Sequence, residues 1–161
     1  MKKAIGVIGL VGAVGATVFG VSKDKKNKKE IEKEKDINKK IGLYYHLLNK
    51  WLKLKQQGKS LADYFAKNEI KTVAIYGYKE LGERLYDELK DSGIEVKYII
   101  DKNVSKVCTE VDVYSPDEEL PKVDAIVVTA TYFYDEIESE LYDVVKCPII
   151  SLEDIVVDIM D

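Results

Sequence analysis

Eight residues between positions 77 and 131 have types and spacing that suit the binding of a phosphorylated sugar. Glycines can form a tight turn before a helix whose first amides bind phosphate, and a carboxylate about 20 residues later can bind a ribose diol. Hydroxyl groups that follow a further strand can form hydrogen bonds with the phosphate or with the sugar. The predicted binding residues are Gly77, Tyr78, Lys79, Gly82, Asp101, Lys102, Thr129 and Thr131.

The glycine motif departs from the dinucleotide fingerprint at one position. The segment GYKELG places Lys79 where that fingerprint has its second glycine. The absent Cβ of that glycine normally lets a pyrophosphate approach the backbone, and a lysine either blocks the approach or replaces it with a direct cation contact. The motif therefore favours a mononucleotide or a nucleotide-sugar over a full dinucleotide, or a degenerate site that binds nothing. NAD(P) and a nucleotide-sugar are the two cofactor candidates.

These candidate binding residues also have an interpretation in which they serve only the fold. Gly77 and Gly82 are typical of a turn and of close helix packing, Asp101 of a turn, and Thr131 of a helix N-cap.

Alternating strand and helix patterns from residue 69 onward predict an α/β fold with a mostly parallel sheet. About five strands joined by crossovers of one hand give a Rossmann-like sheet in the order 3-2-1-4-5. Its ligand crevice would lie at the carboxyl ends of strands 1 and 4. One strand is expected in the apolar run Val73–Ile75 before Gly77, and a second ends at Asp101. Further strands are expected at 111–114, 125–129 and 148–150, a helical turn at 116–120, and helices at 132–145 and from Ser151 through Val156.

The first 21 residues suit a transmembrane anchor. Residues 4–21 carry no charged side chain, a length at the short end for a membrane-spanning helix. A cleaved signal peptide and a soluble helix are the alternatives. Lysines after this stretch outnumber those before it, which predicts a single pass through the inner (cytoplasmic) membrane with the following domain facing the cytoplasm.

Between the anchor and the α/β domain the sequence predicts a charged linker, residues 22–40, and a helical connector, residues 41–68. Apolar residues recur at helical spacing from Ile37 to Trp51, so one face of this helix should be buried. That face could form a coiled-coil seam, or pack against the α/β body or a second copy. The nucleotide-binding domain then occupies residues 69–161.

Charge and side-chain chemistry narrow the function classes. The chain has a net charge of −4, with lysines concentrated before residue 70 and acids after it. The acidic part would repel phosphate backbones, which argues against nucleic acid as a partner, and the basic part suits an anionic membrane. Cys108, Cys147 and His46 have none of the spacings of metal or nucleophilic sites. We therefore predict no catalytic residue and no metal ligand.

Several segments together carry a family resemblance. KWLKLKQQGKSLADYF, VAIYGYKELGERLYDEL, VKYIIDKN, VDAIVVTATYFYDEI and CPIISLEDIV cover about residues 51–156. This stretch resembles the Rossmann-like modules of bacterial surface-polysaccharide biosynthesis proteins, namely the nucleotide-binding half of nucleotide-sugar epimerase/dehydratases and the N-terminal module of sugar acetyltransferases. The resemblance implies that Gly77, Gly82 and Asp101 contact a nucleotide.

The sequence thus predicts a membrane-anchored, cytoplasmic module that binds a nucleotide or nucleotide-sugar without catalysis and serves cell-surface polysaccharide biosynthesis. Its expected partners are the membrane, the ligand, and a second copy or an enzyme of glycan biosynthesis. Two alternatives stay open. One is a minimal NAD(P)- or sugar-nucleotide-dependent enzyme completed by a partner chain, and the other is a structural interaction protein with a vestigial pocket.

Overall fold

The structure, a computed structural model, describes the backbone of residues 11–161 and the side chains of residues 27–161. Residues 43–161 form one compact unit, and the described residues before them belong to a separate unit. The first element, helix α1 (Val11–Gln56), includes the predicted charged linker, whose described side chains before Lys40 are all exposed. Within the described part of the chain, no helix has both the length and the apolar character needed to span a membrane. The anchor predicted over residues 1–21 lies outside the residues whose side chains are described.

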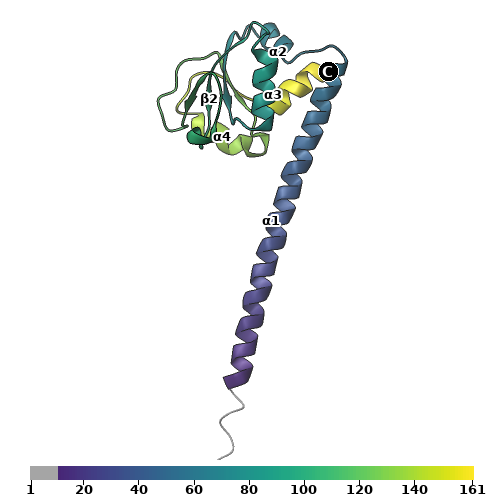
Figure 1. Cartoon of the computed structure of the whole chain (residues 1–161), viewed down its shortest axis with the longest axis vertical. Helices are drawn as coiled ribbons and strands as arrows, with labels where there is room; N and C mark the ends of the chain where they lie inside the picture. The colour runs from purple at the N-terminus through teal and green to yellow at the C-terminus, as the bar shows by residue number, and fades with distance from the viewer. Residues whose placement is uncertain (1–10) are drawn as a thin grey trace, which may run out of the picture. The chain divides into compact units, whose positions relative to one another are not determined.

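The compact unit contains a sheet of five parallel strands in the order β3-β2-β1-β4-β5, which confirms the predicted topology (Figure 1). The central strands are continuous apolar runs because both of their faces are covered, as expected for a parallel sheet. The strands are β1 (Thr72–Tyr76), β2 (Glu95–Ile100), β3 (Asp112–Tyr114), β4 (Ala125–Val128) and β5 (Ile149–Ser151).

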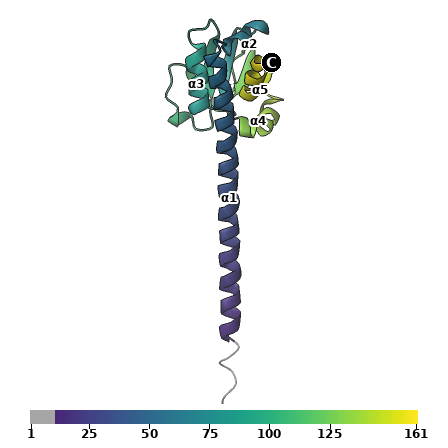
Figure 2. The same cartoon turned by 90° about the vertical axis from the view of Figure 1, so that its right-hand side faces the viewer.

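Helices cover both faces of the sheet. Along β1, Val73 and Ile75 belong to one core cluster, and Ala74 and Tyr76 belong to the other. The first cluster receives side chains from α2, α3, α5 and residues 43–56 of α1, and the second receives them from α4. Figures 1 and 2 show the helices around the sheet. These helices are α2 (Ala62–Lys67), α3 (Glu80–Leu89), α4 (Tyr134–Leu141) and α5 (Leu152–Met160).

Two predicted helical segments differ from the structure. The expected helical turn at 116–120 is a turn in which the Ser115 hydroxyl bonds the Asp117 carboxylate and the Glu118 amide donates to the Ser115 carbonyl. Such local side-chain bonds compete with helix formation. The helix expected over residues 132–145 is the 3₁₀ turn η2 (Thr131–Phe133) followed by the shorter α4.

One face of the connector helix is buried within the compact unit, but the predicted stripe is buried only in part, because Ile37, Ile41 and Leu48 are exposed. Leu47, Trp51 and Leu54 of α1 are at most 4% exposed and pack into the core beside α3. The Trp51 indole also donates a hydrogen bond of 2.7 Å to the carboxylate of Glu88, near the end of α3. Residues 43–56 are therefore part of the α/β body and not a separate linker.

Candidate functional site

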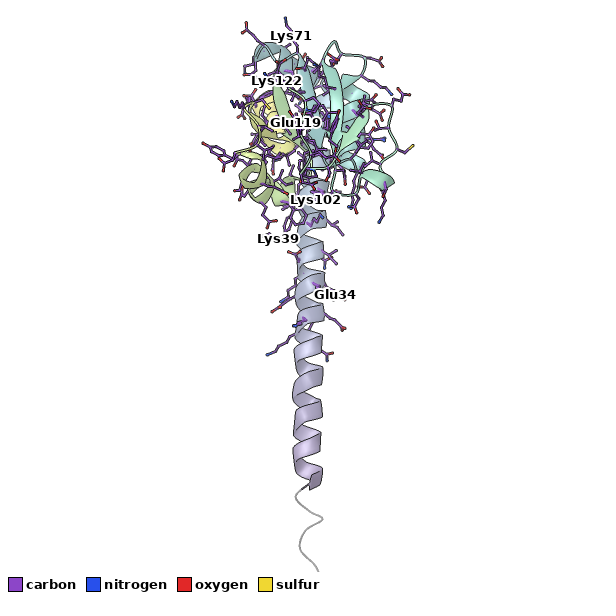
Figure 3. The ribbon with its side chains drawn as sticks, turned by 90° about the vertical axis from the view of Figure 1, so that its left-hand side faces the viewer. Glu34, Lys39, Lys71, Lys102, Glu119 and Lys122 are labelled. Atoms are coloured by element: carbon purple, nitrogen blue, oxygen red, sulfur yellow. The ribbon has the colours of Figure 1, made fainter. Side chains whose placement is uncertain are left out.

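The candidate site lies at the carboxyl edge of the sheet, where the direction of chain connection reverses. From β1 the chain passes through α3 to β2 on one side, and β4 pairs with β1 on the other side. Ligands of open α/β sheets bind outside the carboxyl ends of the strands at such a point. Figure 3 shows Lys102, which follows β2 at this edge, and shows Lys71 and Lys122 at the opposite end of the unit.

The first element of the site is the turn between β1 and α3. Gly77 has a φ of +88°, a left-handed conformation that glycine adopts readily, and its amide donates to the Ile100 carbonyl at 2.8 Å. Gly82 is buried, and a Cβ at this position would lie 2.2 Å from the Gly77 carbonyl oxygen. The two glycines therefore let the start of α3 rest directly on the turn, as the first and third glycines of the dinucleotide fingerprint do.

The start of α3 combines an exposed cation with two acids. Lys79 is the N-cap residue, is exposed, and makes no side-chain capping bond. The first amides of a helix have no acceptor within that helix, so they can bind an anion. Glu80 and Glu83 in the first turn already complement the helix dipole, and they would repel a phosphate. A phosphate at this position would therefore depend on Lys79 to balance these carboxylates.

Asp101 joins the end of β2 to the glycine turn. Its Oδ2 accepts a hydrogen bond of 3.1 Å from the Tyr78 amide, and its Oδ1 accepts one of 2.8 Å from the Asn103 amide. The Asp101 amide donates to the Tyr114 carbonyl at 3.0 Å, which fixes the residue beside β3. Each carboxylate oxygen can accept two hydrogen bonds, so one acceptor position on each oxygen remains for a ligand hydroxyl.

The two threonines of the predicted site have different surroundings. Thr129 is 4% exposed, and its hydroxyl donates to the Gly77 carbonyl at 2.7 Å. The Thr129 hydroxyl therefore supports the glycine turn from the β4 side. Thr131 begins η2 and is half-buried. Of the two, Thr131 is the more open to solvent and is better suited to contact a ligand.

The remaining predicted residues are Tyr78 and Lys102. The Tyr78 ring packs edge-on against Tyr86 with ring centroids 6.1 Å apart, so only its amide takes part in the contact with Asp101. Lys102 forms an ion pair of 2.9 Å with Glu140 of α4. Both members of this pair are exposed, so the pair contributes little to stability and leaves Lys102 able to exchange partners.

Sequence reasoning missed Glu140 and Tyr76. The Tyr76 hydroxyl lies 3.5 Å from Glu140 Oε2. Burial, and then the nearby Glu140 carboxylate, raise the pKa of Tyr76 above its ordinary value. The position of Tyr76 at the end of a buried strand, on the carboxyl edge, was the only sequence signal for its place in the site. Glu140 lies on α4, far from Tyr76 in sequence, so no local pattern marked it.

The structure thus brings Gly77, Tyr78, Gly82, Asp101 and Thr129 together around one turn, through the contacts given above.

Comparison with known proteins gives no match, either to a family model, to a curated protein or to a solved structure. The resemblance to polysaccharide biosynthesis modules therefore stays a prediction. Among the side chains that the structure describes, no cluster of histidine, cysteine and acidic residues could hold a metal ion.

Proposed function

We propose that the carboxyl edge of the sheet binds a nucleotide or nucleotide-sugar, and that the chain is a non-catalytic binding module anchored at the cytoplasmic membrane. In this proposal a phosphate lies at the first amides of α3 beside Lys79, and Asp101 accepts hydrogen bonds from ribose hydroxyls. Thr131 and Lys102 line the outer part of the site. A role in cell-surface polysaccharide biosynthesis belongs to the same proposal and rests on the sequence resemblance alone.

The observation that carries the proposal is the hydrogen bond from the Tyr78 amide to Asp101. It places a carboxylate against the glycine turn at the topological switch point of the sheet. A nucleotide needs a ribose acceptor and a phosphate donor at adjacent positions, and the end of β2 and the start of α3 supply groups of these two kinds.

One alternative has specific support. The hydroxyl of Thr129 and two acceptor positions of Asp101 are already used within the protein, and Glu80 and Glu83 place negative charge at the start of α3. These contacts favour a structural role in which the same residues hold the turn and no ligand binds. Ligand binding and its absence are therefore the two outcomes to separate.

Thermal unfolding of residues 43–161 with NAD, NADP, UDP-glucose and coenzyme A separates them. A ligand present at about 100 times its dissociation constant stabilises the folded state by about 2.7 kcal/mol. We expect at least one of these nucleotides to raise the unfolding temperature. No shift with any of them at millimolar concentration would support the structural role instead.

A matched pair of substitutions tests the role of Asp101. Asp124 also accepts hydrogen bonds from two backbone amides, those of Lys71 and Thr72, but it lies at the amino edge of the sheet. We expect Asp101→Asn to weaken nucleotide binding by about tenfold, the effect of one lost charge-assisted hydrogen bond. Asp124→Asn should leave affinity unchanged. Titration calorimetry measures both, and equal affinities for the two variants would remove Asp101 from the site.

A further inference from the structure

Helix α1 has a second apolar face whose side chains are exposed. The face that enters the core contains Leu47, Trp51 and Leu54. At about 100° per residue, a second line of side chains lies roughly 120° around the helix from it. Its apolar members are between 41% and 63% exposed, and they are Ile31, Ile41, Tyr45, Leu48 and Leu52.

These residues follow a heptad repeat. Residues 31, 38, 45 and 52 occupy a positions, and residues 34, 41 and 48 occupy d positions, the alternation of three and four residues that forms a coiled-coil seam. Glu34 places a charge at a d position and so limits the repeat toward the N-terminus. We call the a and d positions that follow it the α1 seam; they are Asn38, Ile41, Tyr45, Leu48 and Leu52.

We propose that the α1 seam pairs with the same seam of a second copy of this chain to form a parallel, two-stranded coiled coil. Asn38 occupies an a position and is exposed. In a parallel, in-register dimer the two Asn38 side chains face each other and can share a hydrogen bond, whereas an antiparallel pairing would place each against an apolar residue. A single asparagine at an a position favours the parallel dimer over other registers and larger assemblies.

One charged pair in the heptad that precedes the α1 seam fits the same orientation. In parallel pairs a g position of one helix faces the e position five residues later on its partner. Glu30 is a g position and Lys35 is the e position that it would face, and both side chains are exposed. The following g and e positions, Ile37 and Gly42, are uncharged and add no repulsion.

Disulfide cross-linking of the full chain in mild detergent tests the proposal. All variants carry Cys108→Ser, since Cys108 is an exposed native thiol. We expect Leu48→Cys to form a covalent dimer on mild oxidation, because d residues of a parallel pair face each other across the seam. His46→Cys is exposed on the same helix but outside the seam, so it should give about tenfold less dimer. Equal yields from the two variants, or no dimer from Leu48→Cys, would overturn the proposal.

Sedimentation of the full chain gives an independent measurement. The protein part should have twice the 18.3 kDa of one chain. Leu48→Glu should return the protein to one chain, because it places a charge at a d position of the α1 seam. Leu48 is 41% exposed, so this replacement spares the core. Glu34→Leu should extend the seam and lower the dissociation constant of the dimer. A single-chain mass for the unaltered protein, or a dimer that survives Leu48→Glu unchanged, would contradict a seam at these residues.

Discussion

Gly82→Ala is expected to destabilise residues 43–161 by about 3 kcal/mol, although alanine is normally the better helix residue by about 1 kcal/mol. The new Cβ would lie 2.2 Å from the Gly77 carbonyl oxygen, a backbone atom that cannot rotate away. Either α3 must move off the turn or the turn must move off the Thr129 hydroxyl that holds it. Chemical denaturation followed by circular dichroism measures the loss.

Gly93→Ala is the control for this substitution. Gly93 has a φ of +85°, but an added Cβ there would meet nothing within 4 Å. Its replacement should therefore cost only about 1 kcal/mol, the penalty of a left-handed conformation for a residue with a side chain. If the two variants lose the same free energy of unfolding, then the contact between α3 and the turn is not what requires glycine at position 82.

Glu88→Ala is expected to cost about 3 kcal/mol or more. The Glu88 side chain is 8% exposed and accepts hydrogen bonds from the Trp51 indole, the Ser60 hydroxyl and the Leu61 amide, at 2.7 to 2.9 Å. Removal of this carboxylate leaves those donors without an acceptor and leaves the ammonium of Lys55, now 3.0 Å away, unpaired. The contacts join α3 to the end of α1 and to the two residues that precede α2, so their loss loosens one face of the core.

Asp87→Ala provides a matched control. Asp87 precedes Glu88 on the same helix, but it is half-exposed and makes only surface ion pairs with Arg84 and Lys90. Such pairs contribute little to stability, so Asp87→Ala should change the free energy of unfolding by less than about 0.5 kcal/mol. A loss as large as that of Glu88→Ala would mean that charge on α3, and not the buried contacts, is responsible.

The contribution of Glu88 should also depend on pH. Burial acts to raise the pKa of Glu88, but hydrogen bonds from Leu61, Lys55, Trp51 and Ser60 outweigh it and hold the pKa below its ordinary value. The stabilisation is therefore complete above the unfolded pKa of about 4.3 and is lost as the pH falls through the folded pKa. The stability difference between the wild-type unit and Glu88→Gln should narrow on acidification below about pH 4.3. A difference that stays constant down to pH 2 would contradict this assignment.

The sheet could be predicted from sequence because each strand is marked by a run of neighbouring apolar residues. The apolar runs at 73–75 and 125–128, separated by helical patterns, favour buried parallel strands, and crossovers of one hand leave few possible orders. The turn at 116–120 could not be predicted as reliably. There the outcome depends on whether Ser115 and Asp117 bond each other or allow a helix to start.

The candidate site was predictable in part for the same reason. Gly77 and Gly82 are marked by their spacing, and their turn and packing roles follow from the strand and helix that flank them. The Asp101 contact with Tyr78 and the Thr129 contact with Gly77 join residues 23 and 52 positions apart, so no local pattern reports them. The same holds for Trp51 and Glu88, which are 37 positions apart.

The most direct test of a nucleotide site at the carboxyl edge is a titration of residues 43–161, labelled with ¹⁵N, with UDP-glucose and, separately, with NAD. Amide resonances report contacts residue by residue. The proposal predicts saturable shifts concentrated at Tyr78, Gly82 and Asn103, with the amides of Lys71 and Thr72 at the opposite edge unmoved. Saturable shifts confined to other surfaces, or none with either nucleotide at millimolar concentration, would contradict it.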